Sequence, residues 1–135
     1  MKLSTRVRYG VRALIDLSKN YSDHPVSIKE IARRQRISFR YLENIFHDLK
    51  KSGILGSTKG KGGGFFLACA LSQVSLLDLI DILDGEFSIV DCLGNDALCE
   101  NAKKCYTRTM WKKLNGEIRG TFARVNLEEV VKSLD

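Results

Sequence analysis

Apolar residues recur at helical spacing in residues 4–20 of the chain. Their positions are Val7, Val11, Leu14 and Ile15. Residues three and four apart lie on one side of an α-helix, and Ser4 can cap the first turn. Residues 21–26 contain the single proline, Pro25, and predict a loop. This part of the sequence therefore predicts an amphipathic helix followed by an irregular connection.

Two further helices are predicted before residue 52. Ser27 and Glu30 have the spacing of a capping box, in which each side chain bonds a backbone N–H near the other residue. They predict a short helix that ends near Arg34. Ser38 can cap a third helix that runs to about Lys51. Its predicted buried stripe is Leu42, Ile45, Phe46 and Leu49.

A β-hairpin is predicted directly after these helices. Residues 54–55 and 65–67 are short apolar runs, and the nine residues between them, 56–64, are rich in glycine and lysine. Three short helices with a tight connection between the second and third, followed by a hairpin, are typical of a winged helix-turn-helix. The combination is more specific than any of its parts.

The second half of the chain predicts helices around a segment without periodicity. Residues 75–83 predict a helix capped by Ser75, and residues 126–134 predict a short closing helix. Residues 85–105 have no clear period but contain three cysteines. Residues 106–122 predict a long helix with one broad apolar stripe. That stripe is Met110, Trp111, Leu114, Ile118 and Phe122.

These elements predict a mostly α-helical protein with one small β-hairpin. We expect a winged helix-turn-helix DNA-binding domain in residues 1–70. Residues 71–135 are expected to form a helical region for sensing and dimerisation, with a cysteine loop at 88–105. A length of 135 residues suits one domain, or a small domain that carries an oligomerisation element.

The charge of the chain is distributed unevenly. The formal net charge is +6, but residues 1–66 hold fourteen Lys or Arg against five Asp or Glu, a net +9. Residues 67–135 carry a net −3. Such an asymmetry favours a nucleic-acid-binding half joined to a second part with another task, although a solvated basic surface without a partner would look the same.

The third predicted helix is the expected reading helix. The second helix of a helix-turn-helix enters the major groove with its N-terminal residues nearest the bases. Arg40 can bond guanine or clamp a phosphate, and Glu43 can accept from a cytosine amino group. An acid close to phosphates is unfavourable, so Glu43 is expected to discriminate bases. The candidate DNA-binding residues of this helix are Ser38, Arg40, Tyr41, Glu43 and Asn44, with His47 also able to face outward.

The tip of the predicted hairpin adds Lys59 and Lys61 to the DNA-binding candidates. Glycines allow the backbone to approach DNA closely, and the lysines can neutralise phosphates. A nucleotide phosphate loop is the competing interpretation. It fails because Gly62 follows Lys61 where serine or threonine is required, and because no strand–loop–helix unit surrounds the motif.

Cys92, Cys99 and Cys105 are the candidate metal ligands, with the spacing C-x6-C-x5-C. Thiolates suit iron–sulfur clusters and zinc. Structural zinc sites use four ligands with closely paired cysteines, which this segment lacks, so a cluster fits better than zinc. Ordinary free cysteines remain an open alternative. Cys69 is expected to be a small buried apolar residue.

The chain resembles the IscR/NsrR/CymR family of bacterial winged-helix regulators. The similar motifs are residues 1–10, Ile31-Ala32, the run from Ser38 to Glu43, the wing Lys59-Gly60-Lys61-Gly62-Gly63-Gly64-Phe65, and the three cysteines followed by Met110-Trp111. The resemblance implies a homodimer held by helix 106–122. It also implies an iron–sulfur cluster on the three cysteines, with 2Fe–2S favoured over 4Fe–4S. The base-discriminating role of Glu43 matches the iron–sulfur-assembly branch.

The resemblance further implies cluster-dependent repression at a double-stranded operator of genes for iron–sulfur assembly, sulfur metabolism or nitrosative stress. The fourth cluster ligand departs from the family. A histidine three residues after the last cysteine is replaced by Arg108, and an aspartate in the first helix is replaced by Arg8. Arginine stays protonated and cannot coordinate a metal. Nearby carboxylates, a hydroxyl group or solvent remain candidates. The alternative is a DNA-binding regulator without a cluster that senses thiol oxidation, nitric oxide or a protein partner.

Other classes of function are disfavoured by the sequence. A cysteine-nucleophile enzyme needs a base near the thiol, and His24 and His47 both lie far from the cysteine loop in sequence. We therefore expect no enzymatic activity and no small-molecule substrate. No apolar run approaches the roughly 18 residues of a membrane span, and residues 1–8 lack a hydrophobic signal core. The expected location is the cytoplasm.

Overall fold

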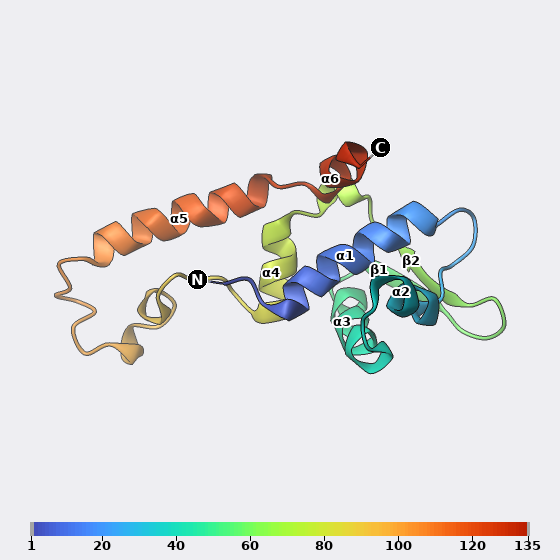
Figure 1. The fold of residues 1–135 in the computed structure, drawn as a ribbon. Helices are drawn as coiled ribbons and strands as arrows, with labels where there is room; N and C mark the ends of the chain where they lie inside the picture. Colours follow the sequence, from blue (N-terminus) through green and yellow to red (C-terminus); the bar gives the residue numbers. More distant parts are fainter. Residues whose placement is uncertain (1, 135) are drawn as a thin grey trace.

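Six α-helices and one two-stranded hairpin form the part of the chain that the computed structural model describes, residues 2–134 (Figure 1). The helices and strands are α1 (Thr5–Asn20), α2 (Ile28–Gln35), α3 (Phe39–Lys51), β1 (Leu55–Thr58), β2 (Gly64–Leu67), α4 (Leu76–Asp84), α5 (Arg108–Arg124) and α6 (Leu127–Ser133). The mostly helical winged helix-turn-helix predicted from the sequence is confirmed. Among the described residues, no helix is both long and apolar enough to cross a membrane.

Side-chain caps begin most of the predicted helices where the sequence places them. Ser4 Oγ accepts from the Val7 N–H at 3.0 Å, and Ser38 Oγ accepts from the Tyr41 N–H at 3.1 Å. Ser75 opens α4 with a complete capping box. Each such bond satisfies one of the backbone donors that a helix start leaves unpaired.

The predicted capping box at the start of α2 is wrong. Ser27 is the N-cap residue, but its side chain makes no capping bond. Glu30 instead lies 3.5 Å from Arg34, one turn further along the helix. The two arrangements compete for the same carboxylate, and the sequence pattern does not show which of them the neighbouring elements favour.

The hydrophobic core is one continuous cluster with α1 at its centre. Helix α1 contacts α2, α3, α4 and α6. The predicted stripe of α3 is fully buried, with Leu42, Ile45, Phe46 and Leu49 all at 0% exposure. Leu79 of α4 and Leu127 of α6 belong to the same cluster. The core therefore extends across residue 70, where the sequence places a domain boundary.

The wing is held to the core by a contact that the sequence does not indicate. Strands β1 and β2 pair antiparallel, with Leu55 opposite Leu67 and Thr58 opposite Gly64. Val26, in the α1–α2 connection, then exchanges two backbone hydrogen bonds of 2.8 Å with Phe65. The Phe65 ring also packs edge-on against Phe46, with 5.0 Å between the ring centroids. The wing is therefore fixed to α3 from one side and to the preceding loop from the other.

Helix α5 differs from the other helices in its packing. It extends away from the body of the molecule, and its N-terminal end connects to the cysteine-containing segment (Figure 1). None of its residues is buried, and Met110 and Leu114 are 46% and 39% exposed. Its C-terminal half contacts α4 through Arg119, which bonds the Asp81 carboxylate at 2.9 Å. The apolar stripe of α5 is thus only partly covered within one chain.

One buried carboxylate ties α1 to α2. Asp16 is 5% exposed and accepts from Arg34 at 2.6 Å and from Gln35 at 2.8 Å. Burial alone raises the pKa of Asp16, but the hydrogen bonds from Arg34 and Gln35 outweigh it and hold this pKa below its usual value. The carboxylate therefore stabilises the folded protein in its charged form.

We expect Asp16→Asn to lower the free energy of unfolding by about 2–3 kcal/mol, because charge-assisted hydrogen bonds in a buried site are lost. The wild-type protein should also lose stability as the pH falls below the ordinary Asp value of 3.8 and through the lower folded pKa, because Asp16 is then protonated. Urea unfolding as a function of pH measures both effects. Asp23→Asn is the matched control, because the Asp23 side chain is 83% exposed. An equal loss in both variants would contradict this account of Asp16.

Candidate nucleic-acid interface and cysteine segment

The outward face of α3 carries the side chains that the sequence predicts to read DNA. Every one of these residues is exposed, while the apolar stripe on the opposite side is buried. The exposed residues are Ser38, Arg40, Tyr41, Glu43, Asn44 and His47. The helix therefore presents hydrogen-bonding and charged groups on the side that faces away from the core.

Sequence reasoning missed the residues that border this face from α1. Tyr9 packs edge-on against Tyr41, with 5.7 Å between the ring centroids, and the Arg12 guanidinium lies 5.2 Å from the Tyr9 ring. Arg6 donates to Asn44 and to the Asp48 carboxylate. Because Arg6 and Asn44 are 38 positions apart in sequence, and Tyr9 and Tyr41 are similarly distant, no local pattern could have indicated these contacts. The basic character of the first half of the chain was the only available signal.

The tip of the wing presents both predicted lysines to solvent. Lys59 and Lys61 are exposed, between residues that bend the chain sharply. Gly60 and Gly62 have φ values of 88° and 79°, in the left-handed region that side chains other than glycine rarely adopt. The Gly63 N–H closes the turn by donating to the Gly60 carbonyl at 3.0 Å. The glycines thus fix the turn that carries the two ammonium groups.

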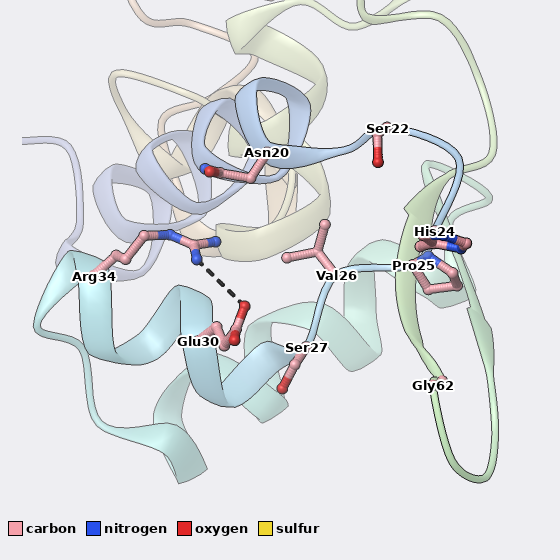
Figure 2. Close-up of a pocket in the computed structure, with 10 residues that line it drawn as sticks. Asn20, Ser22, His24, Pro25, Val26, Ser27, Glu30, Arg34 and Gly62 are labelled. Carbon is pink, nitrogen blue, oxygen red and sulfur yellow. Dashed lines mark ion pairs between the residues drawn. The ribbon is translucent and has the colours of Figure 1, made fainter.

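An open groove lies between α2, the α1–α2 connection and the wing (Figure 2). Arg34 and Glu30 of α2 line it, together with His24 of the connection and Gly62 of the wing. Arg34 bonds Asp16 and also pairs with Glu30, so its charge is already compensated within the chain. This groove therefore adds little to the basic character of the surface.

The three cysteines lie in the segment between α4 and α5. Cys92, Cys99 and Cys105 are partly exposed thiols, and none forms a disulfide. Within residues 2–134, no three His, Cys, Asp or Glu side chains converge closely enough to hold a metal ion. Three thiols in one short segment have the donor chemistry that an iron–sulfur cluster requires. The donor set fits a cluster, but the segment does not draw the sulfur atoms together on its own.

Arg108 holds part of this segment in place. Its guanidinium pairs with the Asp96 carboxylate and donates to the Cys92 carbonyl at 3.4 Å. The side chain that occupies the expected fourth-ligand position therefore bonds the backbone of one candidate ligand. Arg8, at the other expected position, is exposed and bonds Thr5 at 3.1 Å.

The environments of the cysteines differ. The Cys105 sulfur lies 3.3 Å from the Thr107 hydroxyl, and this hydrogen bond lowers the pKa of the thiol. Burial, with a smaller effect of Asp78, raises the pKa of Cys69. Cys69 packs against the core at the end of the wing, but it is half-buried rather than buried as predicted. Of these two thiols, Cys105 is therefore the better source of a thiolate.

Comparisons with known proteins agree with this arrangement. The family model Rrf2, described as an iron-dependent transcriptional regulator, matches residues 3–133. The IscR transcriptional regulator of Photorhabdus laumondii is 32% identical over 98% of this chain and 80% of its own length. The Serratia proteamaculans IscR is 33% identical over 100% and 82%.

Two solved structures are similar along the whole chain. CymR of B. subtilis, whose structure describes it as the global cysteine regulator, has a TM-score of 0.79 and 30% identity and covers 100% of this chain and 99% of its own. T. potens IscR has a TM-score of 0.78 and 30% identity, with coverage of 100% and 89%. The matching relatives are regulators rather than enzymes, in agreement with the sequence prediction. The chain therefore belongs to the Rrf2 family of transcriptional regulators.

Proposed function

We propose that this protein is a homodimeric repressor that binds a two-half-site DNA operator. Its targets are genes for iron–sulfur assembly or related processes, and an iron–sulfur cluster on the cysteine segment controls its binding. The observation that carries the DNA-binding part is the outward face of α3, where every predicted reading residue is exposed above a fully buried stripe. The exposed wing lysines extend this surface.

The two parts of the surface have different roles in DNA binding. Arg40 and Glu43 on α3 can reach base edges in the major groove, where arginine pairs with guanine and a carboxylate accepts from cytosine. Lys59 and Lys61 on the wing neutralise phosphates, which contribute affinity for any sequence. The net +9 of residues 1–66 supports this division, because phosphate contacts depend on total positive charge.

Removing one wing lysine should weaken binding to all DNA duplexes alike. For Lys59→Ala or Lys61→Ala, we expect the slope of log affinity against log salt concentration to fall by about 0.9, the value for one lost phosphate contact. Fluorescence anisotropy on two unrelated duplexes at several salt concentrations measures this slope. Lys132→Ala is the matched control, since Lys132 is an exposed lysine on α6 that pairs with Glu128.

Glu43→Ala should behave in the opposite way to the lysine variants. It should leave non-specific affinity equal or higher and relax the preference for one base. A uniform loss of binding in Glu43→Ala would contradict its role in base discrimination.

The lysine prediction has its own contrary outcome. A change of slope in Lys132→Ala as large as that in Lys59→Ala or Lys61→Ala would show that the wing makes no special phosphate contact.

The dimer is proposed to form through α5. A second copy of the chain can cover the partly exposed stripe of this extended helix, in which Leu114 and Met110 are among the most exposed apolar residues. A two-fold dimer would place two copies of α3 on successive major grooves. Those grooves lie about 34 Å apart, one turn of DNA.

Leu114→Glu should convert the dimer to a monomer, because the substitution places a charge in the proposed interface. We expect the affinity for a two-half-site operator to fall about a hundredfold, because the two DNA-binding domains are no longer linked to each other. Analytical ultracentrifugation and anisotropy measure the two effects. Lys113→Glu is the matched control, because it introduces the same group at an exposed polar position of α5. A wild-type protein that is monomeric at micromolar concentration would contradict the proposal.

The cluster is proposed to bind through Cys92, Cys99 and Cys105, with 2Fe–2S favoured. The support is the donor chemistry of three partly exposed, unpaired thiols in one segment. When bound, an iron–sulfur cluster supplies a redox-active centre that responds to iron supply and to oxidants. Arg108 bonds the Cys92 carbonyl and Asp96, so this chain positions one ligand backbone through a residue that cannot itself coordinate iron.

Anaerobic reconstitution tests the cluster directly. We expect visible absorption, iron and acid-labile sulfide in the wild-type protein, and a loss of more than about half of the iron in Cys92→Ser, Cys99→Ser or Cys105→Ser, because each substitution removes one thiolate ligand. Cys69→Ser should retain the full iron content, since Cys69 packs against the core outside the segment. A protein that stays free of iron and still binds its operator tightly would exclude cluster sensing.

A second candidate function keeps the DNA-binding dimer and replaces the cluster with thiol oxidation, nitric oxide or a protein partner as the signal. Two observations favour it. The described residues bring no three metal-binding side chains together, and the Thr107 hydrogen bond lowers the pKa of Cys105. Where thiol oxidation is the signal, an oxidant, and not iron supply, should change DNA binding, and Cys105→Ser should abolish the response. Iron content and oxidant response in the same variants separate the two functions.

A further inference from the structure

Arg6 joins three elements through one guanidinium group. It lies on α1, and its Nε donates to the Leu83 carbonyl at the end of α4, at 2.9 Å. Its Nη1 donates to Asn44 Oδ1 at 2.5 Å, and its Nη2 pairs with the Asp48 carboxylate. Asn44 and Asp48 are one turn apart on α3. All three nitrogens of the guanidinium are therefore bonded, one to α4 and two to the face of α3 that carries Asn44 and Asp48.

The chemistry of arginine determines the orientation of the Asn44 amide. A guanidinium has only donors, so the atom of Asn44 that faces it must be the oxygen. The amide nitrogen then lies on the opposite side of Cγ. Within the described part of the chain, no neighbour accepts a hydrogen bond from this nitrogen, and Asn44 is exposed. Asn44 therefore presents an NH₂ group outward.

We infer that Arg6 orients the Asn44 side chain so that it reads the DNA bases through its NH₂ group. A free asparagine reads adenine with both ends of its amide, accepting from N6 and donating to N7. Arg6 takes one of the two lone pairs of the Asn44 oxygen and holds this oxygen toward α1, so the NH₂ group is the end of the amide that faces outward. An outward donor favours a base that offers acceptors alone in the major groove. Guanine, with O6 and N7, fits best. This inference rests on the proposed function, because it requires α3 to enter the major groove.

The surroundings of Arg6 keep it in this role. The Leu83 carbonyl belongs to α4, whose next residue, Asp84, accepts from the Ser4 hydroxyl at 2.8 Å. This second bond holds the end of α4 against the start of α1. Asp48 is compensated by the same guanidinium, so its charge near the DNA phosphates is offset. Arg6 is thus a positioning residue that is anchored from two sides.

Selection from a random duplex library, followed by sequencing, tests the inference without a known operator. The wild-type protein should enrich guanine at one position in each half-site, and Asn44→Ala should lose preference at that position alone. Asn44→Asp has no donor and should shift the preference to cytosine, which offers an amino group. Arg6→Met frees the amide, so the guanine-to-adenine ratio there should fall about three- to tenfold.

Two further variants serve as controls. Asp48→Asn should keep the guanine preference, because Arg6 Nη1 still bonds Asn44. Arg6→Lys keeps a charged donor group and should restore part of the preference that Arg6→Met loses. These shifts in base preference are compared only among variants with wild-type circular dichroism and thermal unfolding. Asn44 is exposed, so Asn44→Asp tests the inference even if Arg6→Met unfolds.

The possible failures are distinguishable. If Glu43→Ala changes a base preference but no Asn44 variant does, α3 reads DNA and the inference is wrong. If Asn44→Asp shifts the preference while Arg6→Met leaves it unchanged, Asn44 reads DNA without help from Arg6, and the positioning role is wrong. If no variant of α3, Glu43→Ala included, changes any base preference, the proposed function itself fails.

Discussion

The close contact between α1 and α4 is the constraint on which the rest of the structure depends. At Gly10, a side chain as small as a methyl group would lie 2.7 Å from Leu83, so α4 packs directly on the α1 backbone. Val7 and Leu14, on the same side of α1, are fully buried. Complete burial of such a side chain contributes about 1.5–3 kcal/mol. Helix α4 therefore belongs to the same rigid core as the helix-turn-helix, although it follows the wing in sequence.

Local patterns predicted most of the fold because they depend on neighbours in sequence. The stripe of α3 from Leu42 to Leu49 follows from helical periodicity, and the caps at Ser4, Ser38 and Ser75 follow from their position before apolar runs. The capping box at Ser27 is absent, since the Ser27 hydroxyl makes no capping bond and the Glu30 carboxylate pairs with Arg34. The exposed face of α3 was predictable for the same reason as the stripe, since it consists of the positions that the buried stripe leaves outside.

Contacts between distant residues were not predictable in this way. Asp16 and Arg34 lie on different helices, and Arg6 reaches α3 and α4 together. A single sequence gives no periodic signal for such pairs, because their meeting depends on how the helices pack. The Val26 bridge to the wing belongs to the same class. These are the contacts that set the orientation of side chains already predicted to be exposed.

The arrangement of the cysteine segment could not be predicted for a different reason, and the segment also adjoins the end of α4 that contacts α1. Spacing identifies three thiols, but no apolar side chain of Cys92 to Cys105 except Ala102 is buried, so the core does not dictate their arrangement. The segment leaves α4 directly after Leu83 and Asp84, which bond Arg6 and Ser4. The segment is therefore joined directly to the end of α4 that contacts α1. These contacts connect the cysteine segment to α1 through α4. Regulation of DNA binding by the segment further requires that two states of the segment favour different positions of α3.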